Sequence, residues 1–595
     1  MLNKIRILGM LLVLAAMFCQ VQADDLTASN QAELIVAINA ANDETNHPGT
    51  DTITLTSDIT LSEVNNNQQG ANGLPAIIST IILDGNDFIL QRDEHAPEFR
   101  LLFVAITGQI TLWRITLQDG NLTESGGGIY NQGILILSNS SILNNTSDTD
   151  GAGIYNTGMT MIISSIIAHN TTSLGYGGGL YNSDLLNVWI SSIDSNEAFG
   201  GGGIVNTKNG SANVIDSTFM NNNASEGAGI SSIGEITISS STFYNNDAFS
   251  FGSGFLNSGQ AEVFNTTISG NLPAITGGGI YNSGFLTLSY STIWNNSASQ
   301  NNGGGGIFTE FISENTPGVT TVSNTIVGNS INGDCSTSSE GGTYTATNNL
   351  ATGDCGDTPV TNLDPVLQDN GGLTFTHALL EGSNAINANG SCNEDPINGL
   401  DQRGYLREVQ CDTGAFEFNG TIPPIELLFN GDFEYDSDGD KIPDEWQGKQ
   451  LTGDKRKCNQ VGEPPVAYSG ECAVRFKGST GEHAKLQQTI VLENFDFAQN
   501  DLLTLSAYVR MKGDNVKGKI VAVVTYADSG LPQSKISLVL QSSPDYTEVS
   551  GSTSLQSDAI TKIKVMIIHK SSSGKVWIDE MSLQQSSSSR IVPLP

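Results

Sequence analysis

Residues 277–298 read GGGIYNSGFLTLSYSTIWNNSA, and they contain most of one copy of a repeat that dominates the 595-residue chain. Within the repeat, an aliphatic or aromatic residue is followed three positions later by asparagine. The pairing recurs about every 25 residues, at Ile142/Asn145, Ile167/Asn170, Ile193/Asn196, Phe219/Asn222, Phe243/Asn246, Ile268/Asn271, Ile293/Asn296 and Ile326/Asn329. A fixed period kept over that length predicts stacked structural repeats.

Other residue types recur with the same period of about 25 residues. Glycine pairs head the units, from Gly126/Gly128 to Gly304/Gly306, and a second apolar column runs from Leu137 to Leu288 beside polar neighbours. This period-two alternation, in units rich in Gly, Asn, Ser, Thr, Ile and Val, predicts strands with one buried face. We therefore predict a parallel β-helix whose coils stack at roughly 4.8 Å. The asparagines would exchange amide hydrogen bonds between coils, and the glycines would occupy the corners.

The N-terminus has the features of a cleavable secretory signal, residues 1–23. Lys4 and Arg6 precede an apolar run, and Ala23 ends a suitable cleavage site. No later apolar segment reaches the roughly 18 residues that a transmembrane helix needs. Six cysteines remain, in the neighbouring pairs Cys335 with Cys355, Cys392 with Cys411, and Cys458 with Cys472. An even number in an exported chain suggests three local disulfides, although sequence does not determine their connectivity.

The charge is strongly negative and unevenly distributed. The formal net charge is -36, and Lys208 is the single Lys or Arg between Arg114 and Arg403. Of the 26 basic residues, 18 follow residue 423. This balance excludes a conventional nucleic-acid binder, which needs a basic face, and it opposes adhesion to anionic lipid. Cations, neutral glycans and basic surfaces remain as partners.

The composition divides the mature chain into five parts. Residues 24–125 contain a predicted capping helix from Asn30 to Asn42 and the first, irregular coils. Regular coils occupy 126–329, and the less periodic stretch 330–423 ends the β-helix. Residues 424–585 form a mixed-charge, β-rich domain, and 586–595 are a polar tail.

Two resemblances follow from these segments. The words GGGIYN, NLDPVLQDNGGLTFTHALLEGSNAI (362–386) and DQRGYLREVQCDTGAFEF (401–418) resemble secreted bacterial right-handed parallel β-helix proteins with a choice-of-anchor Q segment. That resemblance covers about residues 24–418 and implies a fold but no reaction. The ends LLFNGDFE (427–434) and KVWIDEMSL (575–583) are similar to carbohydrate-binding modules of the family 4/9, CenC-like type. This second resemblance implies a jelly-roll β-sandwich.

The sharpest local motif is an acidic loop with carboxylates at alternate positions: Asp436, Asp438, Asp440 and Asp444. Such a turn can direct several oxygens at one hard cation, and Gly439 permits the bend. Gln447 replaces the glutamate of an EF-hand, so the loop is closer to the DxDxD loops of thrombospondin type 3 repeats. We predict calcium, with a solvated acidic turn as the alternative. The module resemblance implies a second calcium site at Glu434 and Asp579, whose alternative is a pair of surface carboxylates.

Aromatic side chains of the C-terminal domain could stack on a sugar ring, although most aromatics in a β-sandwich belong to the core. The candidates are Trp446, Tyr468, Tyr508, Tyr526, Tyr546 and Trp577. Of these, Trp446 and Tyr508 are the first choices.

Catalysis on the β-helix has weaker support. A lyase needs groups that neutralise a uronate carboxylate, and the regular coils contain only Lys208 and His169 as basic side chains. A hydrolase needs two carboxylates, and Glu197 and Asp247 fall in one column two coils apart, about 9.6 Å by stacking geometry. Two exposed acids can share a column by chance.

The sequence thus predicts an all-β protein: a β-helix with an N-terminal cap helix, followed by a β-sandwich. The leading function is a non-catalytic one, attachment to a polysaccharide or cell-surface glycan, with the β-helix as scaffold and the sandwich as a calcium-bound module. The alternative is an extracellular polysaccharide lyase or glycoside hydrolase. The oligomeric state is left open.

Overall fold

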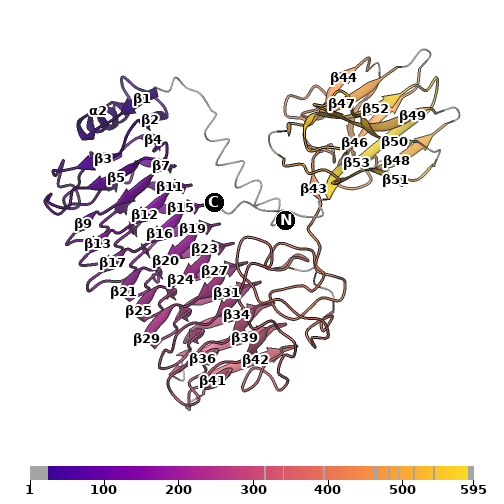
Figure 1. Cartoon of the computed structure of the whole chain (residues 1–595). Helices are drawn as coiled ribbons and strands as arrows, with labels where there is room; N and C mark the ends of the chain where they lie inside the picture. Colours follow the sequence, from indigo (N-terminus) through magenta and orange to yellow (C-terminus); the bar gives the residue numbers. More distant parts are fainter. Residues whose placement is uncertain are drawn as a thin grey trace. The chain divides into compact units, whose positions relative to one another are not determined.

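A computed structural model describes residues 25–586, except 314–315, 340, 391, 393–394, 452, 461–464, 480–482, 493–494, 514–515 and 541–542. The predicted signal at 1–23 and most of the predicted tail lie outside these residues. The described chain forms two compact units, 25–421 and 422–586 (Figure 1). The first is a parallel β-helix and the second an antiparallel β-sandwich, which confirms the predicted fold class.

The β-helix consists of four parallel sheets in which each coil adds at most one strand to a sheet. The thirteen-stranded sheet contains, in order, β1 (Asp25–Ala28), β2 (Asp51–Leu55), β4 (Thr80–Asp84), β7 (Gln109–Trp113), β11 (Ile134–Ser138), β15 (Met159–Ile163), β19 (Leu185–Trp189), β23 (Ser211–Ile215), β27 (Glu235–Ser239), β31 (Gln260–Phe264), β34 (Phe285–Ser289), β39 (Val319–Ser323) and β42 (Thr343–Thr347). The eleven-stranded sheet contains β3 (Ile59–Leu61), β5 (Ile89–Arg92), β8 (Thr116–Gln118), β12 (Ser141–Leu143), β16 (Ile166–Ala168), β20 (Ser192–Asp194), β24 (Thr218–Met220), β28 (Thr242–Tyr244), β32 (Thr267–Ser269), β35 (Thr292–Trp294) and β40 (Ile326–Gly328).

Two further sheets complete the coils. The ten-stranded sheet contains β6 (Leu102–Val104), β10 (Ile129–Asn131), β14 (Ile154–Asn156), β18 (Leu180–Asn182), β22 (Ile204–Asn206), β26 (Ile230–Ser232), β30 (Phe255–Asn257), β33 (Ile280–Asn282), β36 (Ile307–Thr309) and β41 (Cys335–Thr337). The six-stranded sheet contains β9 (Asn121–Leu122), β13 (Thr146–Ser147), β17 (Thr171–Thr172), β21 (Glu197–Gly200), β25 (Asn223–Glu226) and β29 (Asp247–Phe251). The short antiparallel strands β37 (Phe311–Ser313) and β38 (Thr316–Pro317) interrupt one late coil.

The predicted columns form the interior of the β-helix. Residues such as Ile193 and Val188 are fully buried in one continuous core. The first glycine of each pair, from Gly126 to Gly304, has a φ between +58° and +77°. An L side chain rarely adopts this conformation, so glycine fits each corner. The first coil is capped by α2 (Gln31–Ala41), where the Asn30 side chain accepts a hydrogen bond from the Glu33 amide. The predicted capping helix is confirmed.

The asparagine ladder also forms, and each buried side chain binds the next coil. Asn170 Nδ2, for example, donates to Asn196 Oδ1 at 3.0 Å, and the same oxygen accepts from the Asn170 amide at 3.0 Å. The ladder runs from Asn145 to Asn296. A second buried ladder lies in the ten-stranded sheet. There, the asparagines that end β10, β14, β18 and β22 are hydrogen-bonded in series from Asn131 to Asn206. The asparagine after the apolar anchor of each repeat is the sequence signal for this second ladder.

One of the eight predicted pairs is out of register. β35 and β40 align Ile293 with Val327, so Val327 and not Ile326 occupies the central position of that coil. Asn329 is consequently exposed and donates to Asn295 at 3.2 Å. The prediction that Asn329 continues the buried ladder is wrong. Val327 follows Ser323 by the same four residues that separate Ile293 from Ser289, so the ladder position of this coil falls on Ser330.

After β42 the chain leaves the coils. Among its described residues, the segment 358–421, here called the strap, contains isolated bridges but no strand, and it packs along the eleven-stranded sheet. Gln402 Oε1 accepts from Thr267 at 2.6 Å, and Arg407 Nη2 donates to Asn265 at 3.0 Å. Arg407 also pairs with Glu417 at 3.2 Å, and both side chains are at most 1% exposed. The DQRG and GAFE segments therefore attach the strap to the outside of the β-helix.

The C-terminal module has two antiparallel sheets around one core. The first contains β45 (Lys455–Cys458), β46 (Cys472–Lys477), β53 (Lys575–Ser586), β48 (Leu502–Lys512) and β51 (Thr547–Ser554), with β43 (Ile425–Glu426) beside β53. The second contains β44 (Gln447–Lys449), β47 (Lys485–Thr489), β52 (Ile560–His569), β49 (Gly518–Tyr526) and β50 (Ser534–Val539). All three predicted cysteine pairs are disulfides: Cys335–Cys355, Cys392–Cys411 and Cys458–Cys472. Among the described residues, no helix is long and apolar enough to cross a membrane.

Candidate functional site

The acidic loop of the module brings three of its four predicted carboxylates together. One oxygen each from Asp436, Asp438 and Asp444 lies within 4.8 Å of the other two. Gly439 at the turn has a φ of +74°, as the predicted bend requires. Asp440 does not join the group, and its Oδ1 instead accepts from the Ile442 amide at 2.7 Å. Local hydrogen bonds of this kind fold the loop from within.

The chemistry of the three carboxylates fits a calcium ion. Calcium takes oxygen ligands, and carboxylates are the usual protein donors. The Asp436 side chain is only 8% exposed, and its Oδ1 has no hydrogen-bond partner. Its Oδ2 faces Arg456 Nη1 at 3.9 Å. A buried carboxylate oxygen without a partner costs free energy unless a cation or donor satisfies it. Backbone carbonyls and water would have to complete the coordination.

The second predicted calcium pair, Glu434 and Asp579, binds backbone groups. Glu434 Oε1 accepts from the amides of Glu471 and Cys472, both at 2.8 Å. Asp579 Oδ2 accepts from the Tyr468 amide at 2.6 Å. Burial raises the pKa of Asp579 to about 6, although the amide hydrogen bonds oppose that rise. The two carboxylates thus hold the same segment, 468–472, from its two ends, and a calcium ion between them stays a prediction.

Next to that segment lies a group of aromatic and basic side chains, here called the aromatic cluster: Tyr468, Tyr508, Arg510, Tyr546 and Trp577. Tyr508 and Arg510 project from β48, and Arg510 lies opposite Trp577 in β53. The Tyr468 and Tyr508 rings stack with centroids 3.7 Å apart and 11° between their planes. The Arg510 guanidinium lies 4.9 Å from the Tyr546 ring and 4.7 Å from the Trp577 ring. These residues form one continuous polar and aromatic surface.

Tyr468 is the most available ring of the cluster. It is 48% exposed, and its other face rests on Tyr508. The contact with Tyr468 raises the pKa of Tyr508 to about 12. Tyr546 is fixed by its hydroxyl, which donates to the Val466 carbonyl at 2.6 Å. The sequence pointed to Tyr508 first. It could not show that Tyr468, 40 positions earlier, covers Tyr508 and presents the free face.

Trp446, the other residue first predicted to stack on a sugar, is buried. It is 5% exposed, packs on Phe433 with centroids 5.5 Å apart, and donates from Nε1 to the Asn430 carbonyl at 3.1 Å. Its ring has no face available for a sugar, which corrects the expectation from sequence. The indole donor is satisfied inside the core, which is the usual arrangement for a buried tryptophan.

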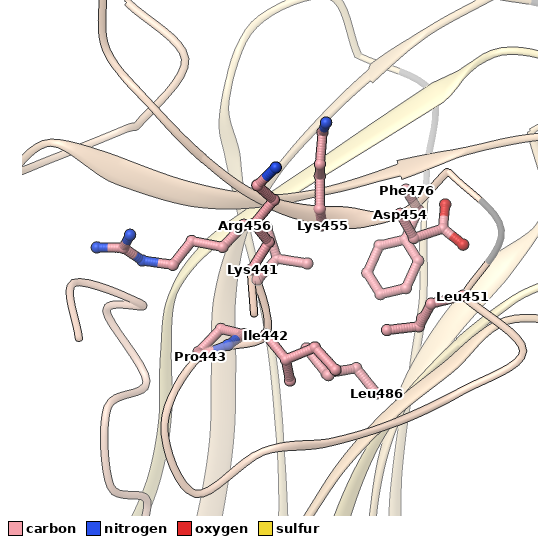
Figure 2. Close-up of a pocket in the computed structure, with 10 residues that line it drawn as sticks. Lys441, Ile442, Pro443, Leu451, Asp454, Lys455, Arg456, Phe476 and Leu486 are labelled. Atoms are coloured by element: carbon pink, nitrogen blue, oxygen red, sulfur yellow. The ribbon is translucent and has the colours of Figure 1, made fainter. Parts of the chain in front are cut away.

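A small pocket lies behind the acidic loop. Its lining includes Ile442, Leu451 and Leu486, and Figure 2 shows the Arg456 guanidinium pointing away from these apolar side chains. The cavity volume is about 10 Å³, which is the space of roughly one water molecule. This pocket is too small for a sugar ring.

The β-helix places the two candidate catalytic acids in register. Glu197 pairs with Asn223, and Asn223 pairs with Asp247, so the acids stand in one column with an asparagine between them. Glu197 is exposed and Asp247 half-buried, both on the outer face of the six-stranded sheet. The shared column is confirmed.

No known protein-family profile matches the chain, and no curated protein does. Solved structures with similarity include a family 61 carbohydrate-binding module in complex with β-1,4-galactotriose (15% identity, 27% of this chain and 97% of that one, TM-score 0.20). A xylan-binding domain from Paenibacillus barcinonensis has 14% identity over 28% of this chain and 97% of that one, with a TM-score of 0.21. The enzymatically active domain of tailspike protein 4 from bacteriophage CBA120 has 10% identity over 94% of this chain and 66% of that one, with a TM-score of 0.25. Likenesses of this size assign no function to the chain.

Proposed function

We propose that this protein binds a polysaccharide or cell-surface glycan through the aromatic cluster of its C-terminal module. The observation that supports the proposal most directly is the half-exposed Tyr468 ring, stacked on Tyr508 beside Arg510. A flat aromatic face can cover the apolar face of a pyranose, and neighbouring polar groups can bind its hydroxyls. The underlying Tyr508 fixes the orientation of Tyr468, which reduces the entropy lost on binding.

In this proposal the β-helix is a rigid, non-catalytic scaffold of an adhesin-like protein. Twelve steps of roughly 4.8 Å separate the first and last strands of the thirteen-stranded sheet, so the stack extends roughly 60 Å. Three disulfides fit an exported protein, secreted or associated with the cell surface. The solenoid carries the module and contributes length and rigidity.

Calcium belongs to the same proposal as a structural ion of the acidic loop. Asp436, Asp438 and Asp444 would hold it, and the ion would supply the positive charge that three neighbouring carboxylates lack. The loop lies in the same module as the aromatic cluster, and Arg456 joins the acidic loop to β45. Calcium would therefore stabilise the module without touching the sugar.

A glycan array with the full chain, in calcium and in chelator, tests the proposal. We expect a defined set of glycans to be retained, and Tyr468→Ala to weaken binding about tenfold through loss of the stacking platform. Phe429→Ala is the matched control, because Phe429 is 53% exposed in the same module but outside the cluster. Retention of no glycan, or equal binding by Tyr468→Ala, would contradict the assignment.

An extracellular polysaccharide lyase or glycoside hydrolase is the second candidate, because Glu197 and Asp247 do share a column. Their spacing of about 9.6 Å lies near the upper limit for an inverting hydrolase. The test is an assay for released reducing or unsaturated sugars with Glu197→Gln and Asp247→Asn. Activity in the native chain that both substitutions abolish would favour the enzyme over the scaffold.

A further inference from the structure

The outer face of the six-stranded sheet carries the same three-residue pattern twice. Strand β21 begins Glu197-Ala198-Phe199, and β29 begins Asp247-Ala248-Phe249. In both, the central alanine is buried, whereas Phe199 is 50% and Phe249 76% exposed. Because strand side chains alternate, each acid and its aromatic neighbour project from the same face. The intervening strand β25 has the polar version, Asn223-Ala224-Ser225.

The two patterns are aligned by the coil register. Glu197, Asn223 and Asp247 are successive partners, and so are the three alanines. Two coils separate the two acids, which places them roughly 9.6 Å apart along the stack. The register shifts at a β-bulge directly after the alanines, so Phe249 projects beside that bulge. The edge formed by β9 to β29 can be followed in Figure 1. A surface that presents two acid–aromatic pairs two coils apart is suited to an extended ligand that carries the same groups more than once.

The aromatic part of this face extends beyond the two phenylalanines. The Tyr176 ring lies over Gly200 and contacts Phe199 edge to face, with centroids 5.6 Å apart. Tyr176 is 40% exposed. Large aromatic rings in water are unfavourable unless a partner covers them. The Tyr176–Phe199 pair and Phe249, two coils away, thus expose three rings on one edge of the sheet, which is the kind of surface that a ligand covers.

Charge decides what kind of ligand fits. Within residues 126–329, twelve side chains are acidic and Lys208 is the single Lys or Arg. Asp148 directly follows β13, two coils before Glu197, and is also exposed, where it accepts from Ser173 at 2.9 Å. An anionic polymer would be repelled by this face, whereas protonated amino groups would be attracted both by the carboxylates and by the aromatic faces.

We propose that this face, Tyr176, Glu197, Phe199, Asp247 and Phe249, binds a linear polysaccharide of amino sugars. The chain lies along the stack, its rings cover Phe199 and Phe249, and its ammonium groups face Glu197 and Asp247. This site is separate from the aromatic cluster of the module and uses no calcium. It holds whether or not the module binds its own glycan.

The test compares two oligosaccharides that differ only in N-acetylation, which removes the positive charge: a hexamer of β-1,4-linked glucosamine and its fully N-acetylated form. Binding to the full chain is measured by calorimetry in mildly acidic buffer, where the amines are protonated. We expect the glucosamine hexamer to bind and the acetylated hexamer to bind at least tenfold more weakly. Added salt should weaken the first interaction, since charge attraction is screened.

Substitutions locate the site. Phe199→Ala with Phe249→Ala should weaken binding of the glucosamine hexamer about tenfold, and Glu197→Gln with Asp247→Asn should weaken it three- to tenfold and flatten its salt dependence. The matched control is Glu262→Gln with Phe285→Ala, an exposed acid and an exposed aromatic on the thirteen-stranded sheet, which should bind as the native chain does. Tyr468→Ala should also leave this affinity unchanged.

Several results would overturn the assignment. They are failure of the native chain to bind the glucosamine hexamer, equal binding of the acetylated form, or equal losses in the control variant. A change from oligomer to monomer in Phe199→Ala with Phe249→Ala would instead assign the face to contact between copies. Loss of binding only in Tyr468→Ala would move the ligand to the module, which separates failure here from failure of the proposed function.

Discussion

The β-helix and the C-terminal module are both built from strands, but they differ in how often each position recurs. In the coils, Ile193 and Asn196 have equivalent residues in the neighbouring coils. Ile193 stacks in a column of apolar residues, and Asn196 is hydrogen-bonded to the asparagines of the coils on either side. In the module, Trp446, Tyr468 and Asp579 occur once, and each is satisfied by a different partner. A repeated residue therefore belongs to the scaffold. A functional candidate in the coils is a departure from the repeat, as at Phe199 and Phe249.

The two regions also differ in electrostatics. The regular coils contain almost no basic side chains, whereas 18 of the 26 basic residues follow residue 423. Hydrogen bonds between uncharged asparagine side chains connect the buried parts of the coils. The acidic side chains therefore lie mainly at the surface. In the module, cations such as Arg456 and Arg510 lie beside acids and aromatic rings. Both regions are all-β, but the coils have a predominantly acidic surface and the module has a surface of mixed charge.

The largest expected effect distinguishes Asn196, which belongs to the buried ladder, from Asn329, which matches the repeat in sequence but is exposed. Asn196→Ala removes the oxygen that serves two Asn170 donors and the amide that binds Asn222. We expect it to lower the free energy of unfolding of the β-helix by roughly 3–5 kcal/mol, because buried donors lose their acceptors. Urea denaturation of the full chain, followed by circular dichroism, measures this.

Asn329→Ala is the control for that experiment. Its spacing to Ile326 matches the repeat, but its side chain is exposed, so we expect a change within about 0.5 kcal/mol. An equal decrease in the free energy of unfolding in the two variants would mean that Asn329 is part of the buried ladder. That result would contradict the alignment of Val327 with Ile293.

Calcium should distinguish the module from the helix. At a hundredfold excess over its dissociation constant, calcium should stabilise the module by about 2.7 kcal/mol. Asp436→Asn or Asp444→Asn should abolish this gain, whereas Asp440→Asn should retain most of it, since Asp440 lies outside the group of three. Thermal unfolding in calcium and in chelator provides the measurement. An unfolding temperature unaffected by chelator in the native chain would exclude a calcium role for the loop.

The smallest effect concerns the acid-only coils. Burial raises the pKa of Glu226 in β25 above its ordinary 4.5. A carboxyl whose folded pKa is raised contributes stability below its ordinary pKa, and that contribution is lost as the pH rises through the folded value. Glu226→Gln should therefore unfold at a higher temperature than the native chain at neutral pH, but not at pH values below about 4. The exposed Glu235→Gln should show no such crossover.

Much of the fold could be predicted because it depends on neighbours in sequence. The 25-residue step led to the strands, the corner glycines and the first ladder, and residues 30–42 led to α2. Three members of the acidic loop, Asp436, Asp438 and Asp444, could be found for the same reason. The strap could not be predicted, because Gln402 contacts Thr267 across 135 positions, and no periodic pattern reports such a contact.

The sequence by itself determined the parallel stacking and the cap, and it suggested three local cysteine pairs and the convergence of most of the loop acids. These features follow from spacing, since the strand period and the turn residues act over a few positions. Only the tertiary structure decided that Asn329 leaves the ladder, that Trp446 is buried, and that Tyr468 covers Tyr508. Exposure depends on which distant segment packs against a side chain. The residues available to a ligand became identifiable only once that packing was known.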